Sequence, residues 1–118
     1  FHADYVNLGF SGSARAEDAI IDYIKGLDMG LFVYDYDHNA PSPEFLESTH
    51  EPFFKKFRQM QPDTPVIFAS DAGVSLRAQG ERRREIIRRT YENARILSAN
   101  RFHFLSSKIS SQLSLMAV

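Results

Sequence analysis

Short apolar runs alternate along the chain with longer segments whose apolar residues recur every three or four positions. A short apolar run is typical of a buried strand, and a three- to four-residue recurrence is typical of a helix with one buried face. The strand-like runs are residues 5–8, 30–35, 66–69 and 101–105. The helix-like segments are residues 13–27, residues 43–60 and the segment that starts near residue 81. This alternation predicts an α/β domain, with a parallel sheet flanked by helices and joined by right-handed crossovers.

Local signals refine three of these elements. Ser13 and Ser42 each precede a helical pattern and are expected to be N-caps, because a serine hydroxyl accepts a hydrogen bond from the first turn. Pro52 lies inside the second helical pattern and is expected to kink or interrupt that helix. The run 30–35 is almost continuously apolar, which predicts a strand covered on both faces.

Composition narrows the function classes. The 118 residues are 43% hydrophobic and 25% charged, which is typical of one globular domain. A net charge of −1 lacks the basic surplus of a dedicated nucleic-acid binder. The absence of cysteine excludes disulfides, thiolate catalysis and Cys-ligated metal sites. No apolar run approaches the roughly 20 residues of a membrane span. From the charge we therefore expect no nucleic-acid partner, and from the length of the apolar runs we expect no transmembrane segment.

Ligands of parallel sheets bind beyond the carboxyl ends of the strands. Three segments follow such ends, namely residues 9–13, 35–39 and 70–75. The first is neither a dinucleotide-binding GxGxxG motif nor a lysine-bearing P-loop, so we expect no nucleotide cofactor. Ser11 is followed directly by Gly12, which also departs from the GxSxG pattern of a nucleophilic serine. A glycine turn ahead of a helix can still present backbone N–H groups to an anion, or form a turn that binds nothing.

The second segment carries the most chemistry. Asp35 and His38 have a spacing that could orient a catalytic imidazole, and the Asn39 amide can donate to a developing negative charge. His38 can equally be an exposed loop histidine, and Asp35 and Asp37 can simply form the turn. A metal site made of Asp35, Asp37 and His38 is a further alternative, although no other ligand cluster supports it.

Two other polar groups favour structural interpretations. The other three histidines, His2, His50 and His103, have no ligand spacing between them and are expected to be structural or exposed. The arginines of the third helix invite a phosphate-binding interpretation. Because glutamates alternate with them opposite the apolar stripe, a solvated helix face is the favoured prediction.

Several sequence blocks resemble the SGNH hydrolases, the GDSL-like lipase/acylhydrolase superfamily. Residues 7–12, Asn-Leu-Gly-Phe-Ser-Gly, are similar to the second conserved block of that family, and residues 31–35 followed by Asn39 resemble the third. The resemblance continues through residues 49–53, Arg58 and residues 62–67, and covers about residues 5–95. It implies one partial domain over residues 1–118, with a divergent tail at 96–118. The implied fold is a three-layer α/β/α flavodoxin-like sheet, here incomplete.

The resemblance also implies a function. Members of the family hydrolyse esters through a serine nucleophile. By motif position, the backbone N–H of Gly12 and the side-chain amide of Asn39 would form the oxyanion hole. The substrate implied is a small-molecule ester, with a carbohydrate O-acetyl ester as one candidate, and neither a cofactor nor a metal is implied. The family's serine strand and its Asp-x-x-His block have no counterpart here, so we expect the nucleophile and the Asp/His dyad outside these 118 residues.

The missing serine strand has a structural consequence. In a flavodoxin-like sheet it would lie between the runs 5–8 and 30–35. We expect either that these two runs pair directly, that a second copy of the chain in a homo-oligomer fills the gap, or that further residues complete the domain.

Two alternatives to a hydrolase remain. One is a non-catalytic flavodoxin-like α/β module for binding or interaction. The other is a receiver or nucleotide-binding domain, which the missing phosphate loop disfavours.

Overall fold

A computed structural model describes residues 3–70, 79–97, 108–109 and 113–117. Helices and strands alternate over most of the chain, as the sequence pattern predicts. In chain order the elements are η1 (Phe10–Gly12), α1 (Asp18–Ile24), β1 (Phe32–Asp35), α2 (Pro43–Met60), β2 (Val66–Ala69), α3 (Gly80–Leu97), β3 (Lys108–Ile109) and β4 (Leu113–Ala117).

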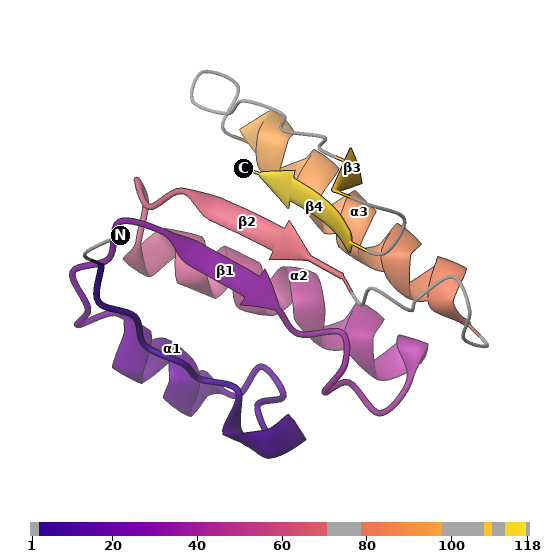
Figure 1. Ribbon diagram of the computed structural model, residues 1–118, viewed down its shortest axis with the longest axis horizontal. Helices are drawn as coiled ribbons and strands as arrows, with labels where there is room; N and C mark the ends of the chain where they lie inside the picture. The colour runs from indigo at the N-terminus through magenta and orange to yellow at the C-terminus, as the bar shows by residue number, and fades with distance from the viewer. Residues whose placement is uncertain (1–2, 71–78, 98–107, 110–112, 118) are drawn as a thin grey trace.

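The strands form one sheet in the order β1-β2-β4-β3 (Figure 1). β1 and β2 are parallel, with Val33 opposite Ile67, as expected for two strands joined by a crossover helix. The predicted α/β class is therefore confirmed, as an incomplete domain. β4 is antiparallel to β2 and to β3, a pairing that the sequence analysis did not anticipate. The strand predicted at 101–105 lies outside the described residues.

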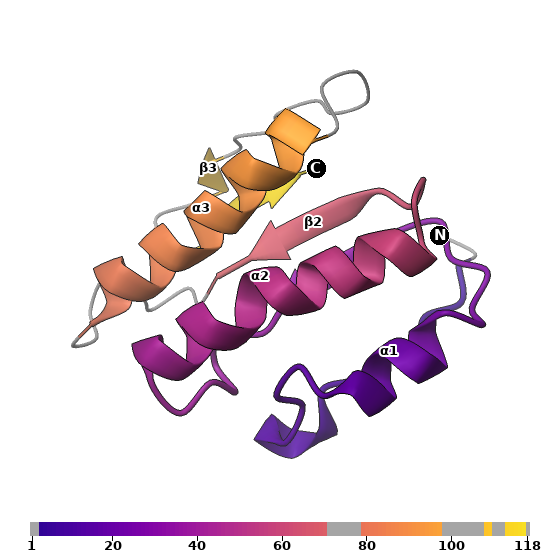
Figure 2. The ribbon, with the colours of Figure 1, turned by 180° about the vertical axis from the view of Figure 1, so that it is seen from behind.

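The helices gather on one face of the sheet. Seen from behind, α2 lies across β1 and β2, α3 lies beside it, and α1 flanks α2 (Figure 2). On β1, Tyr34 points to the helices and is buried, whereas Val33 points the other way and is 53% exposed. The prediction that this strand is covered on both faces is therefore wrong. The strand is apolar at Val33 as well as at Tyr34, although only the face that carries Tyr34 is covered.

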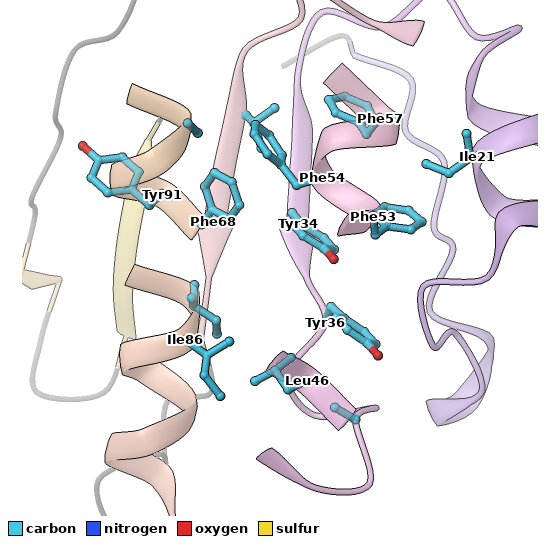
Figure 3. Close-up of a cluster of buried hydrophobic side chains, with 14 of the residues drawn as sticks. Ile21, Tyr34, Tyr36, Leu46, Phe53, Phe54, Phe57, Phe68, Ile86 and Tyr91 are labelled. Atoms are coloured by element: carbon cyan, nitrogen blue, oxygen red, sulfur yellow. The ribbon is translucent and has the colours of Figure 1, made fainter. Parts of the chain in front are cut away.

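Aromatic side chains of α2 and the strands fill the core under the helices (Figure 3). Phe57 is fully buried and stacks on Phe32, with ring centroids 4.4 Å apart. α2 is N-capped by Ser42, whose hydroxyl accepts from the Phe45 N–H at 3.2 Å, as predicted.

The same helix continues without interruption through Pro52, contrary to the interruption that proline suggested. A proline inside a helix costs about 3 kcal/mol, and each buried phenylalanine contributes roughly 1.5–3 kcal/mol. Phe53, Phe54 and Phe57, all buried after the proline, outweigh that cost.

The N-terminal segment departs most from the sequence prediction. Residues 5–8 form no strand, and Tyr5 and Val6 are exposed. Of the three alternatives for the gap in the sheet, direct pairing of residues 5–8 with the run 30–35 is wrong, because β1 pairs only with β2 among the described residues. Ser13 is not an N-cap, since α1 begins at Asp18 after Glu17. Ala16, at φ 64°, is left-handed and breaks the helical path that the spacing predicted to start at residue 13.

Candidate functional site

The turn that follows β1 places Asn39 at the carboxyl end of the sheet. Its backbone N–H donates to the Tyr36 carbonyl at 3.0 Å and closes a four-residue turn. Asn39 is half-buried. This turn lies in the predicted segment 35–39, and Asn39 Oδ1 lies near Gly12 of η1.

Gly12 is the η1 residue that lies beside Asn39. A Cβ placed on Gly12 would lie 3.7 Å from Asn39 Oδ1, so the glycine backbone and the amide side chain are immediate neighbours. Gly12 has φ 84°, a left-handed conformation that glycine adopts without strain. The structure therefore brings together the two residues that the sequence singled out, although they are 27 positions apart in the chain.

The Gly12 N–H is engaged within its own turn. It donates to the Gly9 carbonyl at 3.2 Å, while the Gly9 N–H is held by Asn7 Oδ1 at 2.8 Å. Phe10 and Ser11 are also left-handed, at φ 43° and 48°, and such residues store roughly 1–3 kcal/mol of strain each. The two left-handed non-glycine residues, Phe10 and Ser11, make η1 a strained turn, of a kind that clusters at functional sites.

Two side chains from other parts of the chain hold the turn of residues 36–39, which we call the Asn39 turn. The Arg83 guanidinium of α3 donates to the carbonyls of Asp37 at 2.7 Å and Ala40 at 3.1 Å. Ser70, the residue after β2, donates to Asp37 Oδ2 at 3.0 Å, and both side chains are buried. In the sequence, nothing distinguishes Arg83 from the neighbouring arginines of the same helix. The only signal for Ser70 was its position after a predicted strand, and the rest of the segment 70–75 lies outside the described residues.

Asp35, Asp37 and His38 also come together. One ligand atom from each lies within 4.8 Å of the others, with Asp37 buried and the other two exposed. This is the three-residue set that the sequence suggested as a metal site. Asp37 Oδ2 accepts the Ser70 hydrogen bond, and no described residue outside the three adds a ligand to the cluster.

His50 is buried in the core, which confirms the structural interpretation. Thr90 Oγ1 donates to the Ile86 carbonyl, so it accepts from His50 Nδ1 at 2.9 Å. The proton therefore sits on Nδ1, and Nε2 meets no hydrogen-bond partner in the described part of the chain. Burial lowers the pKa of His50 to about 3, which keeps the ring neutral. His2 and His103 lie outside the described residues.

Tyr36, the first residue of the Asn39 turn, ties the N-terminal segment to α2. Its hydroxyl lies 3.3 Å from the Arg15 carbonyl and 2.9 Å from Thr49 Oγ1. Burial raises the pKa of Tyr36, while the Thr49 hydrogen bond and the nearby charges of Arg15 and Arg83 act against it. Tyr36 therefore stays protonated at neutral pH and donates its hydroxyl proton.

The arginine-rich face of α3 is a solvated surface, as predicted. Arg82 pairs with Glu44, Arg89 pairs with Glu47 at 2.7 Å, and Arg88 pairs with glutamates of its own helix. These ions are about half-exposed, so each pair contributes little to stability. Arg83 and Arg84 are half-buried, and the Arg83 guanidinium donates to the turn that carries Asn39.

Comparison with known proteins agrees with this architecture. The model of the GDSL-like Lipase/Acylhydrolase family matches residues 1–108. No curated protein and no solved structure gives a significant match. Across the described ranges, none of the helices combines the length and the apolar character needed to cross a bilayer. The family match includes both Gly12 and Asn39, and the chain belongs to the GDSL-like lipase/acylhydrolase family, whose members are hydrolases of the SGNH kind.

Proposed function

We propose that this chain carries the oxyanion-binding half of a serine ester hydrolase. The observation that supports the proposal is the proximity of Gly12 to Asn39, whose Oδ1 would lie 3.7 Å from a Cβ placed on Gly12; the two residues carry a backbone N–H and a side-chain amide. A pair of such donors suits the oxygen of an acyl group under attack. The substrate is a small-molecule ester, and a carbohydrate O-acetyl ester is the candidate we favour.

In ester hydrolysis the Gly12 N–H and the Asn39 amide would act at one step, the stabilisation of the oxyanion. A serine hydroxyl from outside these residues attacks the ester carbonyl carbon while a base takes its proton, and the carbonyl π electrons move onto the oxygen. Asn39 and Gly12 donate to that oxyanion. The intermediate then collapses, the alcohol leaves with the proton, and water hydrolyses the acyl-serine by the same steps.

The Gly12 N–H has to exchange its present partner for this task. Its 3.2 Å bond to the Gly9 carbonyl is at the long end of the usual range. An oxyanion is a stronger acceptor than a neutral carbonyl, since charge-assisted hydrogen bonds are about twice as strong. We therefore assign the resting η1 turn a small rearrangement when the acyl group binds.

The test is turnover of p-nitrophenyl acetate by the full-length protein. Asn39→Ala is expected to lower kcat by about 10²–10³-fold with little change in KM, because the donor acts on the transition state. Asn93→Ala is the matched control, because it likewise removes a side-chain amide, but one on α3 that donates to Glu51 at 3.1 Å. Equal kcat for wild type and Asn39→Ala would remove Asn39 from the mechanism.

A non-catalytic binding module is the second candidate. The engagement of the Gly12 N–H with Gly9 favours it, since a turn already satisfied internally needs no oxyanion. Folded wild-type protein that does not hydrolyse p-nitrophenyl acetate would support this candidate over the hydrolase.

A further inference from the structure

We propose that Arg83 is a positioning residue that holds Asn39 in place for oxyanion binding, an inference that rests on the proposed function. Its guanidinium makes three hydrogen bonds, one to the Asp37 carbonyl at 2.7 Å and two to the Ala40 carbonyl at 3.1 Å. These two carbonyls bracket Asn39 in the chain. One side chain on α3 thereby fixes the backbone on both sides of the amide donor.

The remaining freedom of the Asn39 turn is small. The Asn39 N–H is bound to the Tyr36 carbonyl at 3.0 Å, and Asp37 is anchored through its carboxylate by Ser70. With Arg83 added, Asp37, Asn39 and Ala40 are each held by a hydrogen bond, from α3, from the residue after β2 or from within the turn itself. Since a displacement of about 1 Å can lower a rate by 10²-fold, such a constraint matters for a donor that must meet a developing charge.

The planar guanidinium is suited to this role. A fork of N–H groups can reach two carbonyls at once in fixed directions, whereas a lysine ammonium presents a single flexible point charge. Arg83→Lys therefore keeps the charge and most of the packing but loses the two-carbonyl geometry. Arg83 acts on the reaction only through Asn39.

The chain offers a matched control in Arg58. Its Nη1 donates to the carbonyls of Gln61, Pro62 and Thr64 at 3.1, 3.1 and 2.7 Å. This clamp holds the turn that precedes β2, whereas the Asn39 turn follows β1. Because β1 and β2 are parallel, the two clamps lie at opposite ends of the strand pair. Arg58→Lys removes the same kind of interaction away from Asn39.

The experiment measures kcat and KM for p-nitrophenyl acetate and the urea midpoint of the full-length protein with Arg83→Lys or Arg58→Lys. Both variants are expected to lower the urea midpoint. Only Arg83→Lys is expected to lower kcat, by about 10- to 100-fold, with KM within about twofold. Millimolar guanidinium added to Arg83→Ala is expected to restore part of kcat, because it can replace the missing donor, whereas it would not repair a purely structural defect. If Arg83→Lys folds poorly, this rescue experiment is the test of the positioning role.

The outcomes separate the two proposals. If wild type hydrolyses the ester and Arg83→Lys has the same kcat as Arg58→Lys, the positioning role is overturned and the proposed function stands. The role is also overturned if guanidinium restores none of the kcat of Arg83→Ala. If folded wild type does not hydrolyse the ester, the proposed function fails and the positioning role fails with it.

Discussion

The packed side of the molecule and its N-terminal segment use the same kinds of residue with opposite results. On the packed side, Phe57 and Phe68 are fully buried between α2, α3 and the sheet. In the N-terminal segment, Tyr5 is 89% exposed and Phe10 is 56% exposed, and the segment around them forms no strand. Aromatic and β-branched residues make a strand only when another strand supplies hydrogen bonds and a covered face.

The candidate site lies where these two regions meet. Asn39 belongs to the packed side, where Arg83 and the turn after β1 hold it. Gly12 belongs to the N-terminal side, in a strained turn whose N–H is bound to its own segment. The backbone of the turn that carries Asn39 is held by another element, whereas the Gly12 N–H would have to leave the Gly9 carbonyl to act as the donor that we propose.

The largest expected effect tests the packed side. Phe57→Ala removes a fully buried ring that stacks on Phe32, and is expected to lower the free energy of unfolding by about 3–5 kcal/mol. Tyr5→Ala, in the exposed segment, is expected to change it by less than about 0.5 kcal/mol. Urea titrations of the full-length variants measure both. Similar losses for the two would show that the N-terminal segment is packed after all.

A second prediction concerns pH and the buried imidazole of His50. Its folded pKa of about 3 lies below the unfolded value of 6.5, so the unfolded state binds the proton first. The contribution of the neutral His50 ring to the free energy of unfolding is therefore fully present well above pH 6.5 and is lost progressively as the pH falls toward 3. At 1.36 kcal/mol per pKa unit, the loss reaches about 2 kcal/mol at pH 5.

The measurement is the free energy of unfolding between pH 7 and pH 5. His50→Gln is expected to flatten this dependence. Carboxylates such as Glu47, whose pKa Arg89 lowers from 4.5, act below this window. An unchanged slope in His50→Gln would contradict the assignment.

The smallest expected effect concerns the start of α2. Ser42→Ala removes the hydroxyl that accepts from the Phe45 N–H, and is expected to lower the free energy of unfolding by about 1 kcal/mol. Ser48→Ala is the control, because that exposed hydroxyl donates to a carbonyl that Thr49 also reaches. Thermal unfolding compares the two. An equal effect would mean that the cap contributes nothing specific.

Prediction from sequence succeeded where the signal was local. The Ser42 cap, the inner face of α3 and the strand 66–69 follow from periodicity and side-chain chemistry. It failed where the outcome depends on distant partners. Residues 5–8 pair with no strand among the residues that the structure describes, and at Pro52 packing outweighs a local penalty.

The candidate site shows the same division. Gly12 and Asn39 were identifiable because family blocks mark their positions, and the structure places them side by side. Arg83 was not identifiable, because one arginine in a run of arginines differs from its neighbours only through the turn it reaches. Whether Gly12 and Asn39 bind an oxyanion stays a prediction.

The most direct test is a crystal structure of the full-length protein after reaction with an alkyl p-nitrophenyl phosphonate, which mimics the tetrahedral intermediate on a nucleophilic serine. We predict a phosphonyl oxygen at about 2.7–3.1 Å from both the Gly12 nitrogen and the Asn39 amide nitrogen, with the Gly12–Gly9 hydrogen bond broken. A phosphonyl oxygen bound by other groups, with η1 unchanged and Asn39 turned away, would contradict the account.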